Sequence, residues 1–357
     1  MPTTVELTIN LAAIRHNLAQ VRRLCPDSRI MAMIKADGYG HGLLATARAV
    51  AAADGLAVAR LEEALQLRHA GIRQRVLLLG TWLDQHDLEV CCRQAFDVVI
   101  HDEASAQLVL ARNDWPGSLR IWLKLDSGMH RLGLPPDSFQ RVREQLRRHP
   151  QVSELVEMMH FSCADEPASD ETGRQLRCFN AVHDPALPAS VANSAALIRL
   201  PECRTGWVRP GIMLYGDNPL PGTDVDLRPA MRFTARVLAV REIGPGEAVG
   251  YGVSWRAGRA SRIATVGVGY GDGYPRHAVS GTPVRIGGGR APLAGRVSMD
   301  SITVDVTDIP PVAVGDMAEL WGEQQPVAEV ADYAGTISYE LLTGVNARVP
   351  RRVIDRS

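Results

Sequence analysis

Lysine is scarce in this chain, because only two of its 39 basic residues are lysine, Lys35 and Lys124. Lys35 follows the apolar run 29–34 and precedes a glycine-rich stretch, while Lys124 ends a second apolar run that begins at Ile121. A lysine amine can lose its proton when desolvated and can form an imine with an aldehyde, and arginine can do neither. We therefore interpret Lys35 as a nucleophile or imine-forming residue at the end of a buried strand, in preference to a strand-end lysine whose amine merely reaches solvent.

The apolar runs that end in these lysines belong to an alternating pattern. Eight short runs rich in β-forming residues are expected to be strands, and most are followed by segments with helical spacing. The runs are 29–36, 55–60, 75–80, 96–100, 119–126, 155–161, 188–193 and 207–214. Eight strands that alternate with helices predict a (β/α)₈ barrel, also called a TIM barrel. A doubly wound sheet is less favoured, because Gly38-Tyr39-Gly40-His41-Gly42 does not match the G-x-G-x-x-G turn of that fold.

Polar residues fall at the ends of several predicted strands, and barrel enzymes place their active sites at the C-terminal strand ends. These residues, in or just after a predicted strand, are Lys35, Arg131, His160, Ser194 and Arg209. A single histidine or arginine at such a place is more often structural than catalytic. Their shared position at one mouth of the barrel favours a common site.

A phosphate site is predicted at the same mouth. Barrel enzymes often bind phosphate in the loops after strands seven and eight. There Ser194 offers a hydroxyl, and Gly211 and Ile212 offer backbone N–H groups. An aldehyde-reactive lysine that faces a phosphate site suggests pyridoxal phosphate as cofactor. An aldolase with a lysine imine would share most of these features, so the residues alone leave both interpretations open.

The pattern changes after residue 228. The chain becomes rich in Val, Thr, Gly and Pro, with stretches of two-residue alternation. Such stretches are 233–240, 263–268 and 301–306. They predict a separate β domain with one helix near 326–334. We expect a barrel domain at 1–228, whose first few residues can pack with the second domain, and a β domain at 229–357.

Composition argues against several classes of protein. The 357 residues carry a formal net charge of −1, which is not that of a dedicated nucleic-acid binder. No apolar run is long enough to span a bilayer, and the N-terminal residues lack the basic region and apolar core of an export signal. The six cysteines show no C-x-x-C spacing. We therefore expect free thiols in a reducing cytoplasm, with neither a disulfide framework nor a metal site.

Four segments of the chain resemble the alanine racemases, a family of fold-type III pyridoxal-phosphate enzymes. They are 34–42, 124–133, 208–216 and 250–252, and the segments 296–300 and 337–340 extend the similarity into the second domain. The resemblance covers essentially the whole chain, and the first segment, Ile34-Lys35-Ala36-Asp37-Gly38-Tyr39-Gly40-His41-Gly42, is highly specific. It implies interconversion of L-alanine and D-alanine, pyridoxal phosphate as cofactor, a barrel followed by a β domain, and a head-to-tail homodimer.

The resemblance also implies two catalytic bases. Lys35 holds the cofactor as an imine and then acts as one base, and Tyr251 acts as the other on the opposite face of the substrate. Two bases suit a racemase, because the proton leaves one face and returns on the other. A tyrosine has a reference pKa of about 10, so His160 and Arg209 are expected to assist it through hydrogen bonding and positive charge. Arg209 is also expected to face the pyridine nitrogen and to keep it unprotonated.

The remaining implied roles concern binding. Arg131 is expected to contact the phenolic oxygen of the cofactor and the substrate carboxylate. Lys124 matches a position where lysine can be carbamylated, and the N–H of Met299 is expected to reach the substrate carboxylate from the partner subunit. The implied phosphate ligands are Tyr39, Ser194, Gly211, Ile212 and Tyr339. The implied substrate-access corridor contains Asp165, Tyr270, Arg276 and Arg296, for which ordinary surface polar residues are a competing interpretation.

Two other functions compete with the racemase. A non-catalytic pyridoxal-phosphate carrier is a single barrel and lacks the second domain that holds Tyr251 here. A fold-type III decarboxylase would have an acidic residue in place of Arg209 and a reactive cysteine near the C-terminus, whereas no cysteine follows Cys203. The racemase is therefore favoured. Alanine is the expected substrate, because Tyr339 and Tyr251 would leave room for little beyond a methyl group.

Overall fold

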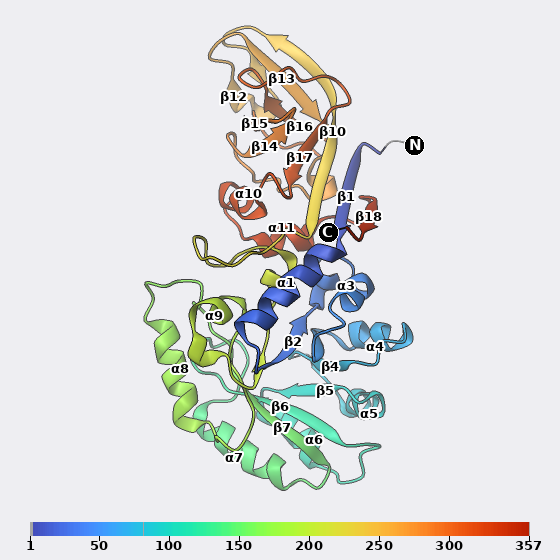
Figure 1. Cartoon of the computed structure of the whole chain (residues 1–357), viewed down its shortest axis with the longest axis vertical. Coiled ribbons are helices and arrows are strands. Elements are labelled where there is room, and N and C mark those ends of the chain that lie inside the picture. The colour runs from blue at the N-terminus through green and yellow to red at the C-terminus, as the bar shows by residue number, and fades with distance from the viewer. Residues whose placement is uncertain (1–2, 81, 357) are drawn as a thin grey trace.

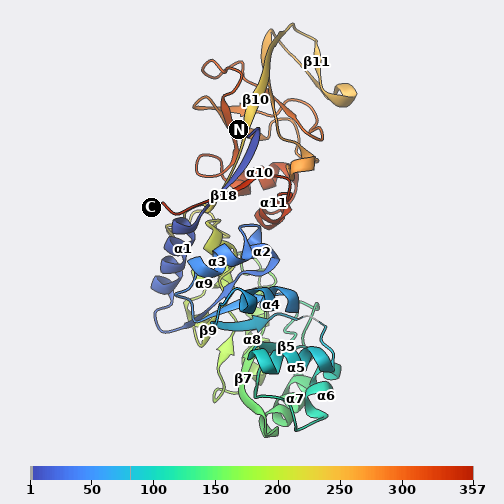
Figure 2. The same ribbon diagram turned by 90° about the vertical axis from the view of Figure 1, so that its right-hand side faces the viewer.

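The chain forms two domains stacked along the long axis of the molecule (Figure 1). The structure, a computed structural model, describes residues 3–80 and 82–356. A barrel of parallel strands is followed by a mainly β domain, so the predicted fold class is confirmed. Seen from the side, α2 (Lys35–Tyr39) and α11 (Ser338–Gly344) meet where the two domains join (Figure 2). No helix within the described residues is long and apolar enough to cross a membrane.

The first domain is a nearly closed eight-stranded barrel within the described residues. Its strands are β2 (Arg29–Met33), β3 (Gly55–Val58), β4 (Arg75–Leu78), β5 (Asp97–Ile100), β6 (Leu119–Lys124), β7 (Val152–Met158), β8 (Ala189–Ser190) and β9 (Trp207–Val208). Each strand pairs in parallel with its neighbour from β2 to β8, and β9 pairs with β2. Between β8 and β9, the N–H of Arg209 donates to the carbonyl of Ala192 at 2.9 Å. This bond brings the two edges of the sheet together.

Helices cover the outside of the barrel (Figure 1). They are α1 (Leu11–Leu24), α3 (Leu43–Ala49), α4 (Leu61–His69), α5 (Gln85–Gln94), α6 (Glu103–Leu110), α7 (Pro136–Arg148), α8 (Glu171–Val182) and α9 (Ser194–Arg199). In α7 the residues at helical spacing, Phe139, Val142 and Leu146, are buried against the strands. The strands are buried on both faces, by the helices outside and by the side chains that fill the barrel inside. Their sequences are therefore continuous apolar runs.

The last two barrel strands are shorter than the sequence pattern predicted. The expected strands 188–193 and 207–214 are each two residues long in the structure. Asn193 instead caps α9, since its side chain accepts from the N–H of Ala196 at 3.0 Å. Pro210 has no N–H to donate to a neighbouring strand. Arg209 therefore lies just beyond its strand, and the apolar residues that follow it form η2 (Ile212–Tyr215).

The second domain contains an eight-stranded sheet and a separate pair of strands, β11 and β12, joined by short turns and 3₁₀ segments. Its strands are β1 (Val5–Asn10), β10 (Met231–Ile243), β11 (Ala248–Val249), β12 (Trp255–Arg256), β13 (Ser261–Val266), β14 (Pro283–Ile286), β15 (Gly289–Pro292), β16 (Ile302–Asp305), β17 (Met317–Trp321) and β18 (Arg351–Ile354). The N-terminal β1 pairs antiparallel with β10 and parallel with β18. Strands from both ends of the chain therefore lie in the sheet of this domain.

The prediction of one helix in this domain was incomplete. The expected helix near 326–334 is α10 (Val327–Ala334), but α11 follows it closely. At seven residues α11 is too short to show a clear helical period, and no side chain caps its first turn. It matters for the site because it carries Tyr339 against the barrel.

A buried carboxylate ties together the N-terminal ends of three barrel strands. Asp97, which is fully buried, accepts hydrogen bonds from Nε of Arg75 at 2.6 Å and Nε of Arg120 at 2.7 Å. Nε1 of Trp122 donates to the same carboxylate at 2.8 Å. Both oxygens of the carboxylate therefore accept hydrogen bonds, two of which come from charged donors, and this offsets the cost of burying its charge.

We predict that Asp97→Asn destabilises the protein by about 3 kcal/mol, because a neutral amide leaves Arg120 without its counter-charge and Arg75 with only Glu154. Circular dichroism monitors unfolding in urea, and the midpoint of the variant is compared with that of the wild-type protein. Asp114→Asn is the matched control, since Asp114 pairs with Arg112 on the exposed surface and its loss should change nothing measurable. Equal midpoints for the two variants would contradict the prediction.

Candidate active site

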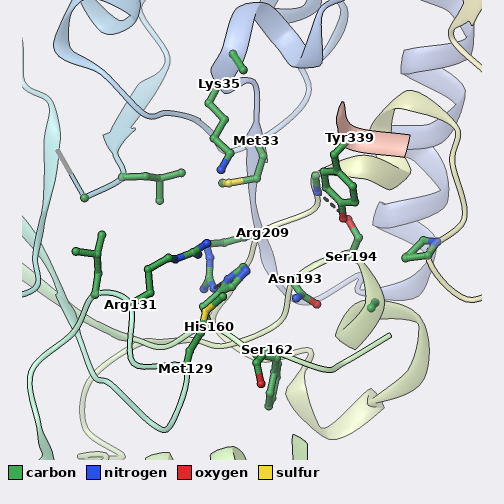
Figure 3. A pocket seen from close by; sticks show the side chains of 18 of the residues that line it. Met33, Lys35, Met129, Arg131, His160, Ser162, Asn193, Ser194, Arg209 and Tyr339 are labelled. Carbon is green, nitrogen blue, oxygen red and sulfur yellow. Dashed lines mark hydrogen bonds between the residues drawn. The ribbon is translucent and has the colours of Figure 1, made fainter. Parts of the chain in front are cut away.

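A cavity of about 640 Å³ opens at the C-terminal ends of the barrel strands. Most of the residues singled out from the sequence line it, although they come from distant parts of the chain. They are Lys35, Tyr39, Lys124, Arg131, His160, Asp165, Ser194, Arg209, Gly211 and Tyr339. The side chains of Lys35, Arg131 and His160 point into this space, and Tyr339 approaches Ser194 from α11 (Figure 3). The barrel topology therefore gathers them at one mouth.

Other expected site residues do not line this cavity. Ile212 is fully buried next to Gly211. Tyr251 in η3 (Tyr251–Val253) is 68% exposed, and Met299 is 54% exposed. Tyr270 in η4 (Tyr270–Asp272) and the two corridor arginines also lie on exposed parts of the β domain. The cavity within one chain thus contains the lysine but not the tyrosine of the expected pair of bases.

Lys35 begins a left-handed turn rather than simply ending a strand. The φ angles of Ala36, Asp37, Gly38 and Tyr39 are 54°, 54°, 61° and 52°. A left-handed conformation costs an L-residue with a side chain roughly 1–2 kcal/mol, so this turn must be held by its surroundings. It lies between Lys35, which lines the cavity from the barrel rim, and Tyr39, which lines it near Ser194.

Two carboxylates hold the ends of this turn. Oε1 of Glu63 accepts from the N–H of Ala36 at 2.7 Å, and its other oxygen accepts from the N–H of Ala59 at 2.9 Å. Oδ1 of Asp37 accepts from the N–H of Leu43 at 2.7 Å, which joins the turn to α3. Glu63 was not predicted from the sequence. Nothing in a glutamate on an amphipathic helix indicates that its side chain contacts the backbone after the neighbouring strand β2.

Two glycines allow the turn to be packed closely. A Cβ on Gly38 would lie 2.5 Å from Oγ1 of Thr46, and one on Gly40 would lie 2.1 Å from the carbonyl oxygen of Leu342. Gly40 also has a φ of 80°, which a side chain disfavours. Because Leu342 belongs to α11, the β domain presses directly on the turn that carries Lys35.

The cavity is strongly cationic. Its lining contains four cations, Lys35, Lys124, Arg131 and Arg209, against two carboxylates, Asp165 and Glu340. Burial, and then the charge of Arg131, lower the pKa of Lys35. Burial, followed by the charges of Arg209 and Arg131, lowers the pKa of Lys124 to about 8. Such a site favours an anionic ligand and keeps a larger share of its amines neutral and nucleophilic.

Arg209 is buried at the centre of this group. Its guanidinium donates to the carbonyls of Ser190 at 2.7 Å and Met159 at 2.6 Å, and to the Ser190 hydroxyl at 2.6 Å. Among the described residues, no carboxylate pairs with it. Burial lowers its pKa to about 10, so it stays charged at neutral pH. It therefore presents an uncompensated positive charge to whatever the cavity binds.

His160 is held beside Arg209 as a neutral ring. Its Nδ1 lies 3.3 Å from a guanidinium nitrogen of Arg209, which can only donate, so Nδ1 accepts and Nε2 carries the hydrogen. Burial, and then the charge of Arg209, lower the pKa of His160 well below its usual value. The carbonyl of His160 accepts from the side chain of Gln175, a fully buried residue of α8 that the sequence did not reveal.

A small polar cradle lies beside α9. The hydroxyl of Ser194 accepts from the N–H of Gly211 at 2.8 Å, and a Cβ on Gly211 would lie 2.7 Å from the hydroxyl of Tyr39. The missing side chain therefore keeps this corner open. The rings of Tyr39 and Tyr339 lie 5.9 Å apart between their centroids. Hydroxyls converging with the N-terminus of a helix suit a phosphate group. Within the described residues, no cluster of metal-ligating side chains occurs.

Comparisons with known proteins agree along the whole chain. The family model described as alanine racemase, N-terminal domain, matches residues 9–219, and that for the C-terminal domain matches residues 230–353. An alanine racemase from Nitrosospira multiformis is 45% identical, covering 98% of this chain and 99% of its own. The crystal structure of biosynthetic alanine racemase from Pseudomonas aeruginosa superposes with a TM-score of 0.94 at 44% identity, over 99% of this chain and 100% of that one. The structure from Acinetobacter baumannii gives 0.92 at 37% identity, with the same shares covered.

We predict that Lys124 in cofactor-free protein titrates near pH 8 in buffer free of carbon dioxide. A lowered pKa means that the neutral amine forms at lower pH, so acetylation of Lys124 should rise with pH through this value and then level off. Peptide mass spectrometry follows Lys124 separately from Lys35.

Two variants test the cause of this shift. Arg209→Gln removes a nearby positive charge and should move the midpoint upward, because the protonated amine is then less disfavoured. Arg112→Gln, which lies outside the cavity, should leave it unchanged. A midpoint close to that of an ordinary lysine in the wild-type protein would contradict the assignment.

Proposed function

The chain belongs to the alanine racemase family, and we propose that it interconverts L-alanine and D-alanine with Lys35 and Tyr251 as its two bases. The observation that carries the proposal is the arrangement around Lys35. A lysine with a lowered pKa faces the same cavity as an uncompensated Arg209 and the polar cradle of Tyr39 and Ser194. Racemisation needs a base on each face of the substrate Cα, because the proton leaves one face and returns on the other.

Pyridoxal phosphate is the cofactor we propose for this cavity. The cradle of Tyr39, Ser194, Gly211 and Tyr339 fits a phosphate, with the backbone of Ile212 beside it. A Cβ at residue 211 would fill the same corner. Burial, and then the charge of Arg131, lower the pKa of Lys35, which raises the share of the neutral amine that can attack an aldehyde. When bound, the cofactor supplies an electron-withdrawing ring that acidifies the Cα–H bond of the amino acid.

In our proposal, Arg209 controls the protonation of the pyridine nitrogen in that ring. A guanidinium that is charged at neutral pH disfavours protonation of a pyridine nitrogen beside it, whereas a carboxylate would favour it. A weaker electron sink limits side reactions such as transamination. This residue argues against the fold-type III decarboxylases, which we expect to carry an acid there. The second domain argues against single-barrel carrier proteins.

The other cations serve the substrate and the bases. Arg131 is proposed to bind the substrate carboxylate and the phenolic oxygen of the cofactor. His160 and Arg209 assist Tyr251, because a neutral imidazole and a nearby positive charge both ease loss of its proton. Lys124 has a pKa of about 8, so it has enough neutral amine to accept carbon dioxide. The carbamate would be an anion that holds Arg131 in place.

We propose a head-to-tail homodimer with shared active sites. Its support is the exposure of Tyr251 and Met299 on the β domain, away from the cavity that contains Lys35 in the same chain. A second copy can bring this surface over the cavity, so that the Met299 N–H reaches the substrate carboxylate and Tyr251 and Tyr339 limit the substrate to a small side chain. Asp165, Tyr270, Arg276 and Arg296 would then line the access corridor. Free cysteines favour a cytoplasmic location.

We predict that borohydride treatment fixes one pyridoxyl group per chain on Lys35, because reduction converts the link between an amine and an aldehyde into a stable secondary amine. The measurement is peptide mapping by mass spectrometry after reduction. Since the chain has two lysines, Lys124 is an internal control within the same cavity. A label on Lys124, or no label, would remove the basis for the cofactor and for Lys35 as its anchor.

We predict that Lys35→Ala and Tyr251→Phe homodimers each lose activity by at least about 100-fold, because each lacks a base that every turnover requires. In a mixed dimer, one site carries both changes and the other carries neither. Random exchange of equal amounts should therefore restore about a quarter of wild-type activity if symmetric sites are shared.

Two differently tagged variants make this mixing test decisive. Pull-down through one tag shows whether mixed dimers have formed, and racemisation is followed by the change in optical rotation. If mixed dimers form and activity stays at the level of the separate variants, both bases come from one chain. The shared-site arrangement would then be wrong.

A further inference from the structure

His41 is a fully buried residue of the Lys35 segment that the proposed chemistry does not use. It is 1% exposed and lies beyond the left-handed turn, outside the cavity lining. Its Nδ1 lies 3.1 Å from the carbonyl oxygen of Gly38 and 2.9 Å from that of Tyr39. Both partners can only accept, so Nδ1 must carry a hydrogen and donate to them.

The surroundings of Nε2, on the opposite side of the ring, are consistent with a hydrogen on Nδ1. Nε2 is buried and has no hydrogen-bond partner among the described residues. Burial lowers the pKa of His41 to about 4, so the ring is neutral at physiological pH and Nε2 carries only a lone pair. An unpaired buried acceptor costs free energy. The position of the ring therefore favours the hydrogen bonds of Nδ1, although it leaves Nε2 without a partner.

The carbonyls held by His41 belong to the strained part of the chain. Gly38 and Tyr39 lie within the left-handed run just before Gly40, with φ angles of 61° and 52°. The ring of His41 also packs on Tyr215, at 4.6 Å between centroids, and Tyr215 stacks on Tyr39 at 4.7 Å. The hydroxyl of Tyr215 donates to the carbonyl of Met33 at 2.9 Å, at the end of β2. The rings of His41 and Tyr215 thus connect both ends of the turn to the barrel.

We propose that His41 is a positioning residue whose Nδ1–H clamps the carbonyls of Gly38 and Tyr39 and so fixes Lys35 relative to Tyr39. Lys35 and Tyr39 line the same cavity from the two ends of this turn. A relaxed turn would move one against the other. The hydrogen bonds within the turn support the clamp itself. Its effect on the binding of pyridoxal phosphate rests on the proposed function.

Two substitutions separate the clamp from simple packing. His41→Asn keeps an N–H donor close to the place of Nδ1 but removes most of the ring, whereas His41→Phe keeps a ring on Tyr215 but has no donor. If His41 acts only by packing, the Asn variant is the more damaged in every measurement, because it leaves a cavity. If His41 acts as a clamp, the Phe variant is the more damaged at the turn.

The first measurement is hydrogen exchange of the full-length protein without cofactor, read by mass spectrometry on the peptide 34–43. Its backbone bonds include Gly40 N–H to the carbonyl of Ala36 at 3.0 Å and Gly42 N–H to that of Asp37 at 2.8 Å. We expect exchange about tenfold faster in His41→Phe, because the turn loses the hydrogen bonds from Nδ1, and near wild type in His41→Asn. The reverse order, or no change in either variant, would overturn the proposal. Should His41→Phe not fold, His41→Leu replaces it.

The second measurement compares pyridoxal phosphate with pyridoxal, which lacks the phosphate. In His41→Phe we expect pyridoxal phosphate to bind about tenfold more weakly and pyridoxal to change by less than about threefold, because only the phosphorylated ligand engages both ends of the turn. His41→Asn should bind both ligands nearly as wild type does. Equal losses for both ligands would contradict the positioning role. Failure of the wild-type protein to bind pyridoxal phosphate would instead reject the proposed function, and the exchange measurement would still decide on the clamp.

Discussion

The candidate site depends on keeping a left-handed turn between Lys35 and Gly40. Residues with side chains resist this conformation, so the turn persists only because its neighbours fix it from several directions. Glu63 binds its first N–H, His41 holds its last carbonyls, and the backbone of α11 closes on Gly40. The barrel supplies two of these contacts and the β domain the third. The position of the lysine amine is thus a property of both domains and not of one loop.

Uncompensated positive charge is the second organising feature. Arg209 is bound by carbonyls and a hydroxyl rather than by a carboxylate. Burial, and then the charge of Arg209, lower the pKa values of both His160 and Lys124. Repulsion among these cations costs stability in the protein alone. It is offset when an anion binds, which makes the same charges a source of affinity for a phosphate or a carboxylate. An acidic residue in place of Arg209 would reverse both effects.

The second domain has two faces with different tasks. The face that carries α11 presses on the Lys35 turn of its own chain, where a Cβ on Gly40 would strike Leu342. Another part of the domain exposes Tyr251 and Met299 to solvent in the single chain. A barrel alone would lack both the contact between α11 and the Lys35 turn and the surface that carries Tyr251. The domain supports the turn that carries Lys35 and, in the proposed dimer, would offer Tyr251 to a neighbouring copy.

The sequence by itself determined the alternation of strands and helices, the change to a β domain, and the residues that gather at the barrel mouth. Apolar runs and scarce lysines are local signals, and strand order then brings Lys35, His160 and Arg209 together. Only the tertiary structure revealed the left-handed turn, the short last strands, α11, and the supporting roles of His41, Glu63 and Gln175. These depend on hydrogen bonds between segments distant in sequence or on a conformation that is stable only when packed. No local pattern of residue types encodes them.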